Sequence, residues 1–193
     1  SSSVFGSSTS VPKSKRTPIR PDSPYAASTV AGEMIGRAYR QSFDMQISVV
    51  RFFNVFGPRQ RADSAYAAVI PAFIDAFLAQ RELIIHGDGL QRRDFTFVDD
   101  VVSVLLLLAR QNHPISDPLN LAWGRPTEIL NLANTIGSIL GIDPRITWAK
   151  SRKSDVRQSW VSAGELAKAV PGITPTSLED GLRKTISYFQ NNR

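Results

Sequence analysis

The stretch Ile47-Ser-Val-Val-Arg-Phe-Phe-Asn-Val55 is a nearly unbroken run of β-branched and aromatic residues. Such a run suits a strand buried on both faces of a parallel sheet better than a strand of an exposed hairpin. A helix is expected before it, because small or apolar residues recur at helical spacing between Pro24 and Phe43, with Ser23 as the cap and Pro24 at the first position. Together these two segments predict an α/β protein.

The rest of the chain continues this alternation. Ser1 to Gly6 is expected to end a strand, and a loop rich in proline, serine and basic residues should follow. Strands are expected at 83–86, 119–122 and 146–149, and helices at 66–80, 98–110, 127–140 and 177–191. A Gly87-Asp-Gly turn should separate the strand at 83–86 from the next helix. Thr127 is expected to cap the helix at 127–140, and the residues from Ser177 to Asp180 form a capping box for the last helix. These elements supply few strands to flank 47–55, so a partner chain or an absent N-terminal segment should cover that part of the sheet.

Length and composition limit the class of protein. With 193 residues and 42% hydrophobic content, the chain can form one compact domain, or a domain with a small lobe. It has no cysteine, which excludes disulfides and thiolate metal sites. The two histidines are far apart in sequence and no carboxylate cluster accompanies them, so no metal site is expected.

Neither a membrane nor a nucleic acid is expected as a partner. The longest apolar run, Val101 to Ala109, is much shorter than the roughly 20 residues of a bilayer-spanning helix, and the first residues do not resemble a signal peptide. The net charge is +6, but most basic residues are interleaved with acidic ones. A solvated loop accounts for the basic cluster formed by Lys13, Lys15, Arg16 and Arg20.

Several motifs occur in a fixed order along the chain. They are Ser1-Ser-Ser-Val-Phe-Gly6, Ser23-Pro-Tyr-Ala-Ala-Ser-Thr-Val-Ala-Gly-Glu33, Arg51-Phe-Phe-Asn-Val-Phe-Gly-Pro58, Gly87-Asp-Gly-Leu-Gln-Arg-Arg-Asp-Phe-Thr-Phe-Val-Asp-Asp100 and Ser154-Asp-Val-Arg157. This series resembles the extended short-chain dehydrogenase/reductase family, and above all its NAD-dependent nucleotide-sugar epimerases and dehydratases of the UDP-glucose 4-epimerase type. The resemblance covers nearly the whole chain but only the C-terminal half of the family.

The resemblance implies a fold and a division of the chain. The expected fold is the C-terminal part of a Rossmann-like parallel sheet plus a small α/β substrate-binding lobe. Residues 1–65 would be a remnant of the dinucleotide-binding domain that carries the catalytic helix. Residues 66–193 would be mainly the nucleotide-sugar substrate-binding region, with interleaved sheet elements.

The resemblance also assigns catalytic residues. Tyr25 takes the place of the tyrosine that removes the proton of the sugar hydroxyl as base and then returns it as acid. A phenol ordinarily titrates near pH 10, and the family lowers this value with the positive charge of NAD and a lysine four residues further on. Thr29 replaces that lysine and carries no charge, so weak or absent chemistry is expected. Ser1 matches the serine or threonine that hydrogen-bonds the reacting oxygen. Ser2 and Ser3 stand where dehydratases have an Asp-Glu pair, which favours an epimerase over a dehydratase and leaves simple reductases or oxidases of sugar nucleotides open.

Further residues match the family's ligand-binding positions. Asn54 and Arg93 match an asparagine and an arginine that hold the substrate diphosphate, and the planar guanidinium suits phosphate oxygens. Arg152, or Arg157 nearby, is expected to be a second phosphate-binding arginine. Phe53 is expected beside the nicotinamide, and the backbone at Val69, Ile70 and Pro71 beside the base.

Each of these residues also has a structural interpretation. Tyr25 could be a packing residue, Asn54 could cap a turn, and Arg93 could be an exposed partner of Asp94. His86 is interpreted as a strand-end residue rather than a catalytic base.

The resemblance implies NAD as the cofactor, but the glycine-rich strand–turn–helix that would hold its pyrophosphate is absent. NAD binding by this chain alone is therefore not expected. The leading hypothesis is a truncated, cytoplasmic nucleotide-sugar epimerase with impaired catalysis. It would bind a nucleotide-diphosphate sugar and either form a homodimer through its first helix or require a missing N-terminal half. The alternative is a non-catalytic sugar-nucleotide-binding or scaffolding module derived from such an enzyme.

Overall fold

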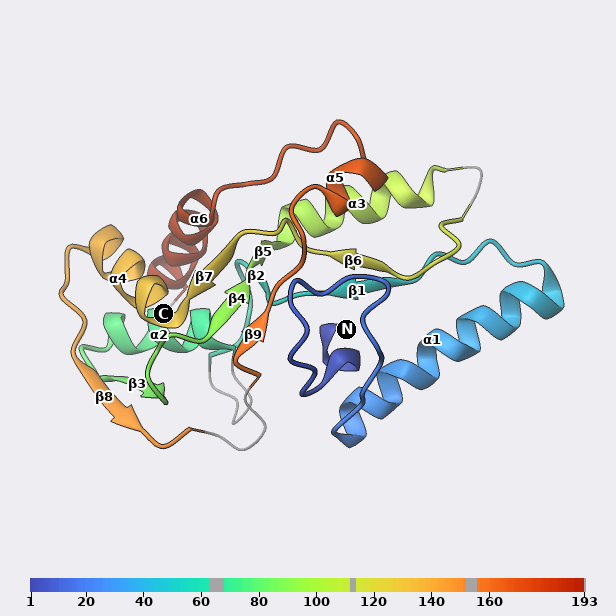
Figure 1. Ribbon diagram of the computed structural model, residues 1–193. Coiled ribbons are helices and arrows are strands. Elements are labelled where there is room, and N and C mark those ends of the chain that lie inside the picture. The colour runs from blue at the N-terminus through green and yellow to red at the C-terminus, as the bar shows by residue number, and fades with distance from the viewer. Residues whose placement is uncertain (63–67, 112–113, 152–155, 193) are drawn as a thin grey trace.

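The computed structural model describes residues 1–62, 68–111, 114–151 and 156–192. Helices and strands alternate along much of this chain (Figure 1). In chain order the elements are η1 (Ser2–Phe5), α1 (Pro24–Phe43), β1 (Val50–Phe52), β2 (Val55–Phe56), α2 (Val69–Leu78), β3 (Leu83–His86), β4 (Arg92–Asp94), β5 (Thr96–Phe97), α3 (Val98–Ala109), β6 (Leu119–Leu121), β7 (Pro126–Glu128), α4 (Ile129–Leu140), β8 (Ile146–Ala149), β9 (Gln158–Ser159), α5 (Glu165–Ala169) and α6 (Leu178–Asn191).

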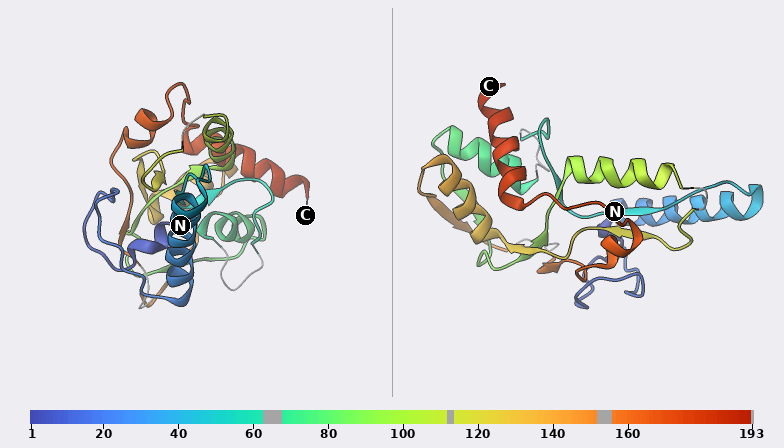
Figure 2. Two further views of the ribbon diagram at one scale, coloured as in Figure 1. Left: turned by 90° about the vertical axis from the view of Figure 1, so that its right-hand side faces the viewer. Right: turned by 90° about the horizontal axis from the view of Figure 1, so that it is seen from above.

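One region of the molecule is built on the parallel pair β1–β6, with Val50 opposite Leu119. Helix α3 packs on one face of this pair through a core cluster that includes Val104 and Leu121. On the other face, η1 and α1 pack against Phe53. Helices α3 and α1 therefore lie on opposite sides of the β1–β6 pair, as the views in Figure 2 show. We call this the helix region.

The second region, which we call the cavity region, is built from α2, α4 and α6 around β3 and β8. Its core cluster joins Phe73 of α2, Ile136 of α4 and Ile186 of α6, each nearly or fully buried. The strands β3 and β8 pair in parallel, and β4 lies between β7 and β9 in a three-stranded sheet. This core is continuous across three helices, so the region resembles the interior of an independent domain.

The basic loop before α1 is only partly solvated, which corrects the expectation for it. Lys15, Arg16 and Arg20 are exposed, but Lys13 is 1% exposed. Its Nζ donates a hydrogen bond to the carbonyl oxygen of Ser8 at 2.5 Å, and burial lowers the pKa of Lys13. The backbone N–H of Lys13 donates to the carbonyl of Trp160 at 2.7 Å, so this lysine fixes the loop to the chain that follows β9.

The strand expected at 47–55 is shorter and broken. Asn54 has a φ of 34°, in the left-handed region, and this turn separates β1 from β2. Phe52 is 39% exposed and, within the described residues, β1 is paired with β6 alone, in parallel. This agrees with the expectation that the chain supplies few strands to flank this segment. The apolar pattern located the strand but could not show where a backbone turn interrupts it.

Two other local predictions were wrong. The segment from Ser1 to Gly6 contains a 3-10 helix rather than the end of a strand. The Ser1 hydroxyl accepts a hydrogen bond from the Ser3 N–H, and the Gly6 N–H donates one to the Ser3 carbonyl. Thr127 does not cap α4 but lies in β7, opposite Arg93 of β4. The turn at Gly87 leads into β4 rather than directly into a helix.

Most of the remaining elements agree with the sequence predictions within one or two residues. Ser23 caps α1 by accepting the Ala26 N–H at 3.1 Å, and Ser177 caps α6 by accepting the Asp180 N–H at 3.0 Å. Helix α2 begins at Val69, and the earlier start expected for it falls outside the described residues. None of the described helices is long and apolar enough to cross a bilayer.

Candidate functional site

A cavity of about 490 Å³ lies between α2, β3 and the chain around β4. This volume is in the range of small-molecule sites, which usually combine an apolar lining with a few polar groups. Helix α2 and β3 supply most of the apolar lining. The polar residues at its wall are Asn54, Arg81, Glu82, His86, Gln91 and Arg93.

Asn54 reaches the cavity because the chain turns between β1 and β2. Its positive φ of 34° is a conformation that asparagine tolerates better than most residues. Its Nδ2 donates to the carbonyl oxygen of Asp94 at 3.1 Å, which connects the turn to β4. Asn54 is thus part of a turn, as its structural interpretation stated, and it also lines the cavity.

Arg93 lies at the centre of β4 and is half-buried at the cavity wall. The strand is held on both sides, by β7 and by β9. The interpretation of Arg93 as an exposed partner of Asp94 does not fit, because Asp94 is fully buried. The Asp94 carboxylate instead accepts backbone N–H groups of Gly124 at 2.8 Å and Val161 at 3.4 Å. Burial raises the pKa of Asp94, while these N–H groups act in the opposite direction.

The start of α2 forms another part of the cavity wall. Val69 and Ile70, which the family resemblance assigns to contact with the base, both line it. Ala68 occupies the cap position and provides no side-chain hydrogen bond. The Ala68 side chain therefore leaves the first N–H groups of α2 without the hydrogen bond that a polar cap residue would provide.

The expected catalytic residues lie in the helix region and do not line the cavity. Tyr25 is the second residue of α1 and is 64% exposed. Thr29 is half-buried one turn later, where its Oγ1 donates to the carbonyl of Ala26 at 2.8 Å and lies 3.4 Å from Ser3 Oγ. Ser1 is half-buried, and its hydroxyl caps η1. Phe53 is fully buried, with its ring 6.2 Å from that of Phe5.

A buried ion pair was not predicted from the sequence. Arg51 of β1 donates to both carboxylate oxygens of Glu33 of α1, at 2.8 and 2.7 Å, and both side chains are about 95% buried. The Arg51 guanidinium also lies 5.1 Å from the centre of the Phe5 ring. Glu33 and Arg51 stood inside the quoted motifs, but nothing in the sequence indicated that they meet. This pair connects α1, β1 and η1.

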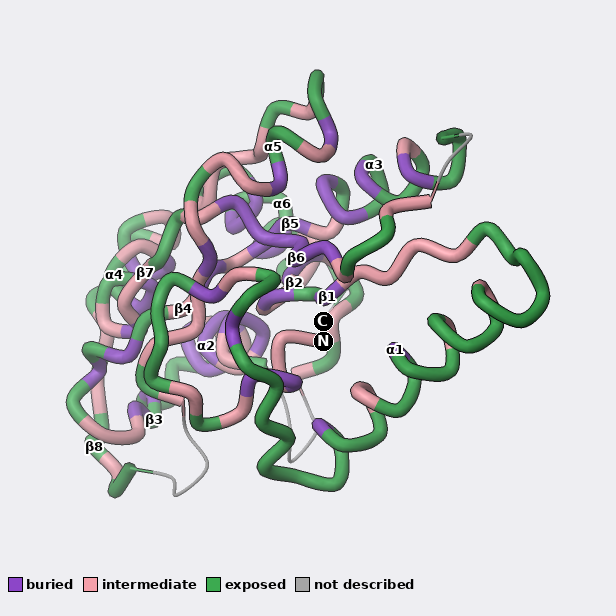
Figure 3. The backbone as a smooth tube through the Cα atoms, turned by 45° about the vertical axis from the view of Figure 1, so that its right-hand side comes forward, coloured by how far each residue is buried: buried purple, intermediate pink, exposed green. Residues whose placement is uncertain are grey.

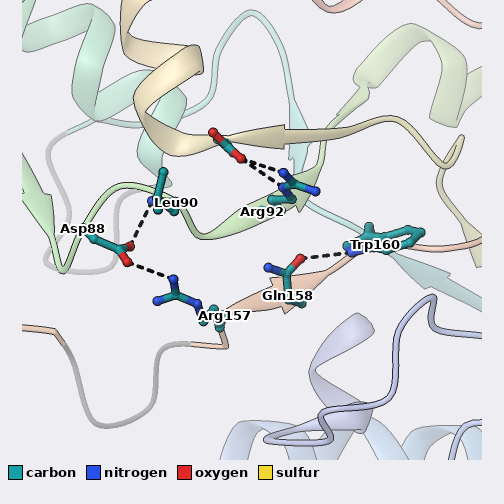
Figure 4. A network of polar contacts seen from close by, with 7 residues as sticks. Asp88, Leu90, Arg92, Arg157, Gln158 and Trp160 are labelled. Atoms are coloured by element: carbon teal, nitrogen blue, oxygen red, sulfur yellow. Dashed lines mark hydrogen bonds and ion pairs between the residues drawn. The ribbon is translucent and has the colours of Figure 1, made fainter.

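A polar network surrounds the turn between β3 and β4 (Figure 4). Asp88 accepts a hydrogen bond from Arg157 at 2.8 Å and from the Leu90 N–H at 3.0 Å. These bonds, above all that from Arg157, lower the pKa of Asp88. Arg157 therefore has a carboxylate partner, and Arg152, the preferred second phosphate ligand, lies outside the described residues.

The structure therefore brings together four of the predicted substrate-binding residues, namely Asn54, Val69, Ile70 and Arg93. It places Ser1, Tyr25, Thr29 and Phe53 as a separate group around η1 and α1. No group of three or more histidine, aspartate or glutamate side chains suited to a metal ion occurs among the described residues.

Three features together define the class of the protein. Its parallel strands are flanked by helices, its ligand-sized cavity has an asparagine and an arginine at the wall, and a tyrosine lies at the start of α1. These are the features of a Rossmann-like protein of the short-chain dehydrogenase/reductase class. The chain belongs to the NAD dependent epimerase/dehydratase family, whose sequence model matches residues 1–122.

Relatives of known sequence and structure support this assignment. The chain is 35% identical over 192 residues to a UDP-glucose 4-epimerase of Mycolicibacterium smegmatis, covering 98% of this chain and 60% of the relative. It superposes with a TM-score of 0.92 and 32% identity on UDP-N-acetylglucosamine 4-epimerase from Methanobrevibacter ruminantium in complex with UDP-N-acetylmuramic acid, covering 100% of this chain and 62% of the other. A UDP-glucuronic acid 4-epimerase from Bacillus cereus, in complex with UDP-glucuronic acid and NAD, superposes with a TM-score of 0.87 and 27% identity, covering 98% of this chain and 59% of the other.

These matches confirm the predicted fold class, the C-terminal part of a Rossmann-like sheet with a small α/β lobe. The chain spans about 60% of the length of the relatives that it matches.

Proposed function

We propose that this chain is the substrate-binding part of an NAD-dependent nucleotide-sugar epimerase, and that it also carries the catalytic tyrosine helix. The cavity carries this proposal, because it gathers Asn54, Arg93 and the start of α2 at one site of suitable size. The names of the relatives add support, since they describe UDP-sugar epimerases.

Each part of the cavity has a chemical role in this proposal. Arg93 pairs its guanidinium with diphosphate oxygens, which a planar fork can contact in two places. Asn54 adds an amide donor to the same group. Val69 and Ile70 present backbone groups to the base, and the apolar side chains of α2 and β3 exclude water around it.

The chemical step belongs to the residues at η1 and α1. The Tyr25 phenolate takes the proton of a sugar hydroxyl and, as the phenol so formed, later returns it, while the Ser1 hydroxyl holds the same oxygen by a hydrogen bond. NAD, when bound, would supply the reversible hydride chemistry at the sugar carbon, and the residues of η1 and α1 would move the proton of the adjoining hydroxyl. Thr29 offers a neutral hydroxyl where the family has an ammonium group, so the chain has one charge fewer to stabilise the Tyr25 phenolate.

The described residues fit only the reactive end of NAD. Tyr25 near the start of α1 is exposed, and Ser1 just before η1 is half-buried. The buried ring of Phe53 packs against Phe5 of η1. No glycine-rich turn joins a strand to a helix in the described ranges with the spacing that holds a pyrophosphate, since Gly87-Asp-Gly leads into β4. Further protein is therefore required to hold the rest of the dinucleotide.

Ligand binding tests the role of the cavity. Titration of the chain with UDP-glucose in a calorimeter should give a measurable Kd, and Arg93→Lys should weaken binding by about tenfold because one ammonium replaces a two-point contact. Arg183→Lys on α6 is the control, because Arg183 pairs with Glu179 on the surface and does not line the cavity. The proposal fails if the chain, even joined to a family dinucleotide-binding domain, binds no nucleotide sugar.

The alternative, a non-catalytic nucleotide-sugar-binding module, is favoured by Thr29. Substituting Thr29→Lys in the complete gene product separates the two. An increase in turnover of about tenfold or more, as expected when a missing acid–base partner is restored, indicates an impaired enzyme. Ser28→Lys is the control, since it adds the same charge at an exposed position of α1. No increase for Thr29→Lys supports the module.

The exposed side of α1 supports a further proposal, association with a second copy or with further protein. Large apolar side chains are exposed along this helix and just after it, which an isolated soluble surface rarely tolerates in one patch. They are Met34, Ile35, Tyr39, Phe43 and Met45. Sedimentation should detect self-association of the chain, and a monomer at high concentration would contradict the homodimer.

A further inference from the structure

We propose that Asp94 is a positioning residue for the diphosphate of the nucleotide sugar, because its buried carboxylate fixes the two strands that flank Arg93. This inference rests on the proposed function. Asp94 ends β4, directly after Arg93, and successive side chains of a strand point to opposite faces. Arg93 accordingly lines the cavity, whereas the Asp94 side chain is fully buried and is not part of the cavity wall. Asp94 therefore acts on the ligand through its neighbour rather than by touching it.

The carboxylate of Asp94 joins the strands on both sides of β4. On one side it accepts the backbone N–H of Gly124 at 2.8 Å and of Arg125 at 3.4 Å, just before β7 begins. On the other side it accepts the N–H of Val161 at 3.4 Å, two residues beyond β9. One side chain thus receives donors from the chain next to each neighbouring strand, so both strands are fixed at the end of β4 that follows Arg93.

The backbone ladder alone is short at this end of β4. The strand has three residues, and the residue opposite Asp94 in β7 is Pro126, which has no N–H to donate. The ladder to β9 reaches only as far as Arg93, opposite Ser159. The N–H groups that the Asp94 carboxylate accepts therefore add hydrogen bonds where the ladder provides fewest.

The segments that donate to the carboxylate are packed closely against each other. Gly124 has a φ of 71°, and a Cβ placed on it would lie 2.5 Å from the backbone of Ala163. The chain after β6 and the chain after β9 thus approach each other beside Asp94 and have little room to move. An NH2 group in place of one carboxylate oxygen would consequently face N–H donors that cannot turn away.

The backbone of Asp94 also holds the second residue that is proposed to bind the diphosphate. Asn54 Nδ2 donates to the Asp94 carbonyl oxygen at 3.1 Å, and the N–H of Thr96 donates to the Asn54 carbonyl at 3.3 Å. Arg93 and Asn54 are therefore both attached to Asp94, the first through a peptide bond and the second through a hydrogen bond. A shift of β4 moves both donors, and a two-point contact with a phosphate tolerates little displacement.

Asp94→Asn tests the inference, because it keeps the size of the side chain but replaces one acceptor oxygen by an NH2 donor. We expect this variant to bind UDP-glucose about tenfold more weakly in calorimetry, the loss expected when a hydrogen bond to a charged group is no longer made. Uridine has no phosphate, so its weaker binding, followed by ligand-observed NMR, should change by less than about twofold. A residue needed only for the fold would weaken the binding of both ligands alike.

A double-mutant cycle shows whether Asp94 acts through Arg93. In an Arg93→Ala background there is no guanidinium to position, so Asp94→Asn should weaken UDP-glucose binding by less than about twofold. Asp100→Asn is the matched control, because Asp100 is also buried and accepts a backbone N–H, from Thr176 at 3.0 Å, but does not line the cavity. Asp100→Asn should lower the free energy of unfolding and leave the Kd for UDP-glucose unchanged.

Urea unfolding shows whether each variant is folded, and Asp94→Ser, which keeps one acceptor oxygen, replaces Asp94→Asn if that variant does not fold. The positioning role is wrong, and the proposed function stands, if neither variant folds or if the folded variant binds UDP-glucose as tightly as the original chain. The same conclusion follows if uridine binding is weakened equally, or if the loss is as large without Arg93. If the original chain binds no UDP-glucose, even when joined to a family dinucleotide-binding domain, the proposed function fails and this inference fails with it.

Discussion

The cavity region and the helix region differ in how they are held together. In the cavity region, α2, α4 and α6 bury their apolar faces against one another in a single cluster. Helix α1 is twice as long as α2, yet among its residues only Ala26 and Glu33 are buried, and one of these is charged. Figure 3 shows this contrast along the chain, with α1 exposed over most of its length.

Under the proposed function, the two regions divide the work. The cavity region would bind the nucleotide sugar, and the helix region would carry the residues of the chemical step. Most of the cavity wall lies on α2 and β3, whose positions are fixed by an apolar core, and Asn54 reaches it from the turn after β1. Helix α1 is held by the Glu33–Arg51 pair and by limited apolar packing around Phe53. Arg40 of α1 also donates to the carbonyl oxygens of Ile115 and Ser116, while large apolar side chains of the helix are left exposed. We infer that the cavity region is held by its own apolar core, whereas the exposed apolar side chains of α1 suit contact with further protein.

The largest effect on stability is expected from breaking the ion pair that fixes α1. Arg51→Met leaves the Glu33 carboxylate buried without its partner and should reduce the free energy of unfolding by about 3–5 kcal/mol. Replacing both, Glu33→Leu with Arg51→Met, should recover much of this loss because no uncompensated charge remains buried. Urea unfolding of the chain measures both values. A double variant as unstable as Arg51→Met would show that the pair does more than neutralise a buried charge.

The contrast in apolar packing predicts the next effect. Ile136→Ala on α4 removes a fully buried side chain from the cavity region and should cost about 2–5 kcal/mol. Ile35→Ala on α1 removes the same atoms from a side chain that is 59% exposed, and should change stability by at most about 0.5 kcal/mol. Denaturant unfolding of the two variants gives a direct comparison. A substantial loss for Ile35→Ala would mean that α1 is already covered in solution, for example by a second copy.

Sequence reasoning was most successful where one local pattern decides the outcome. The cap at Ser23, the cap at Ser177 and the short strand at 83–86 each follow from a few adjacent residues. The short strands β4, β7 and β9 were missed, because two or three residues give no periodicity and their pairing is decided by distant partners.

The same limit applies to the candidate site. The motifs indicated Asn54 and Arg93 individually, and the structure places both at one cavity. They did not indicate that Glu33 meets Arg51, nor that Asp94 is buried among backbone N–H groups, because both contacts depend on the tertiary fold. Burial of a charged residue is decided by what surrounds it, and the sequence alone does not contain that information.

The smallest effect concerns Asp94, which joins the two regions. It lies at the end of β4 in the cavity region, and its carboxylate accepts the N–H of Gly124, which follows β6 of the helix region. Because burial raises the pKa of Asp94 above 3.8, the folded state binds more protons than the unfolded state between 3.8 and the raised value. The contribution of Asp94 to the free energy of unfolding should therefore fall as pH rises through that interval. Asp94→Asn cannot titrate, so the stability of the original chain relative to this variant should decline over the same interval in urea unfolding. A relative stability that rises with pH would mean that the backbone N–H groups outweigh desolvation, and that the joint between the two regions is strongest when Asp94 is charged.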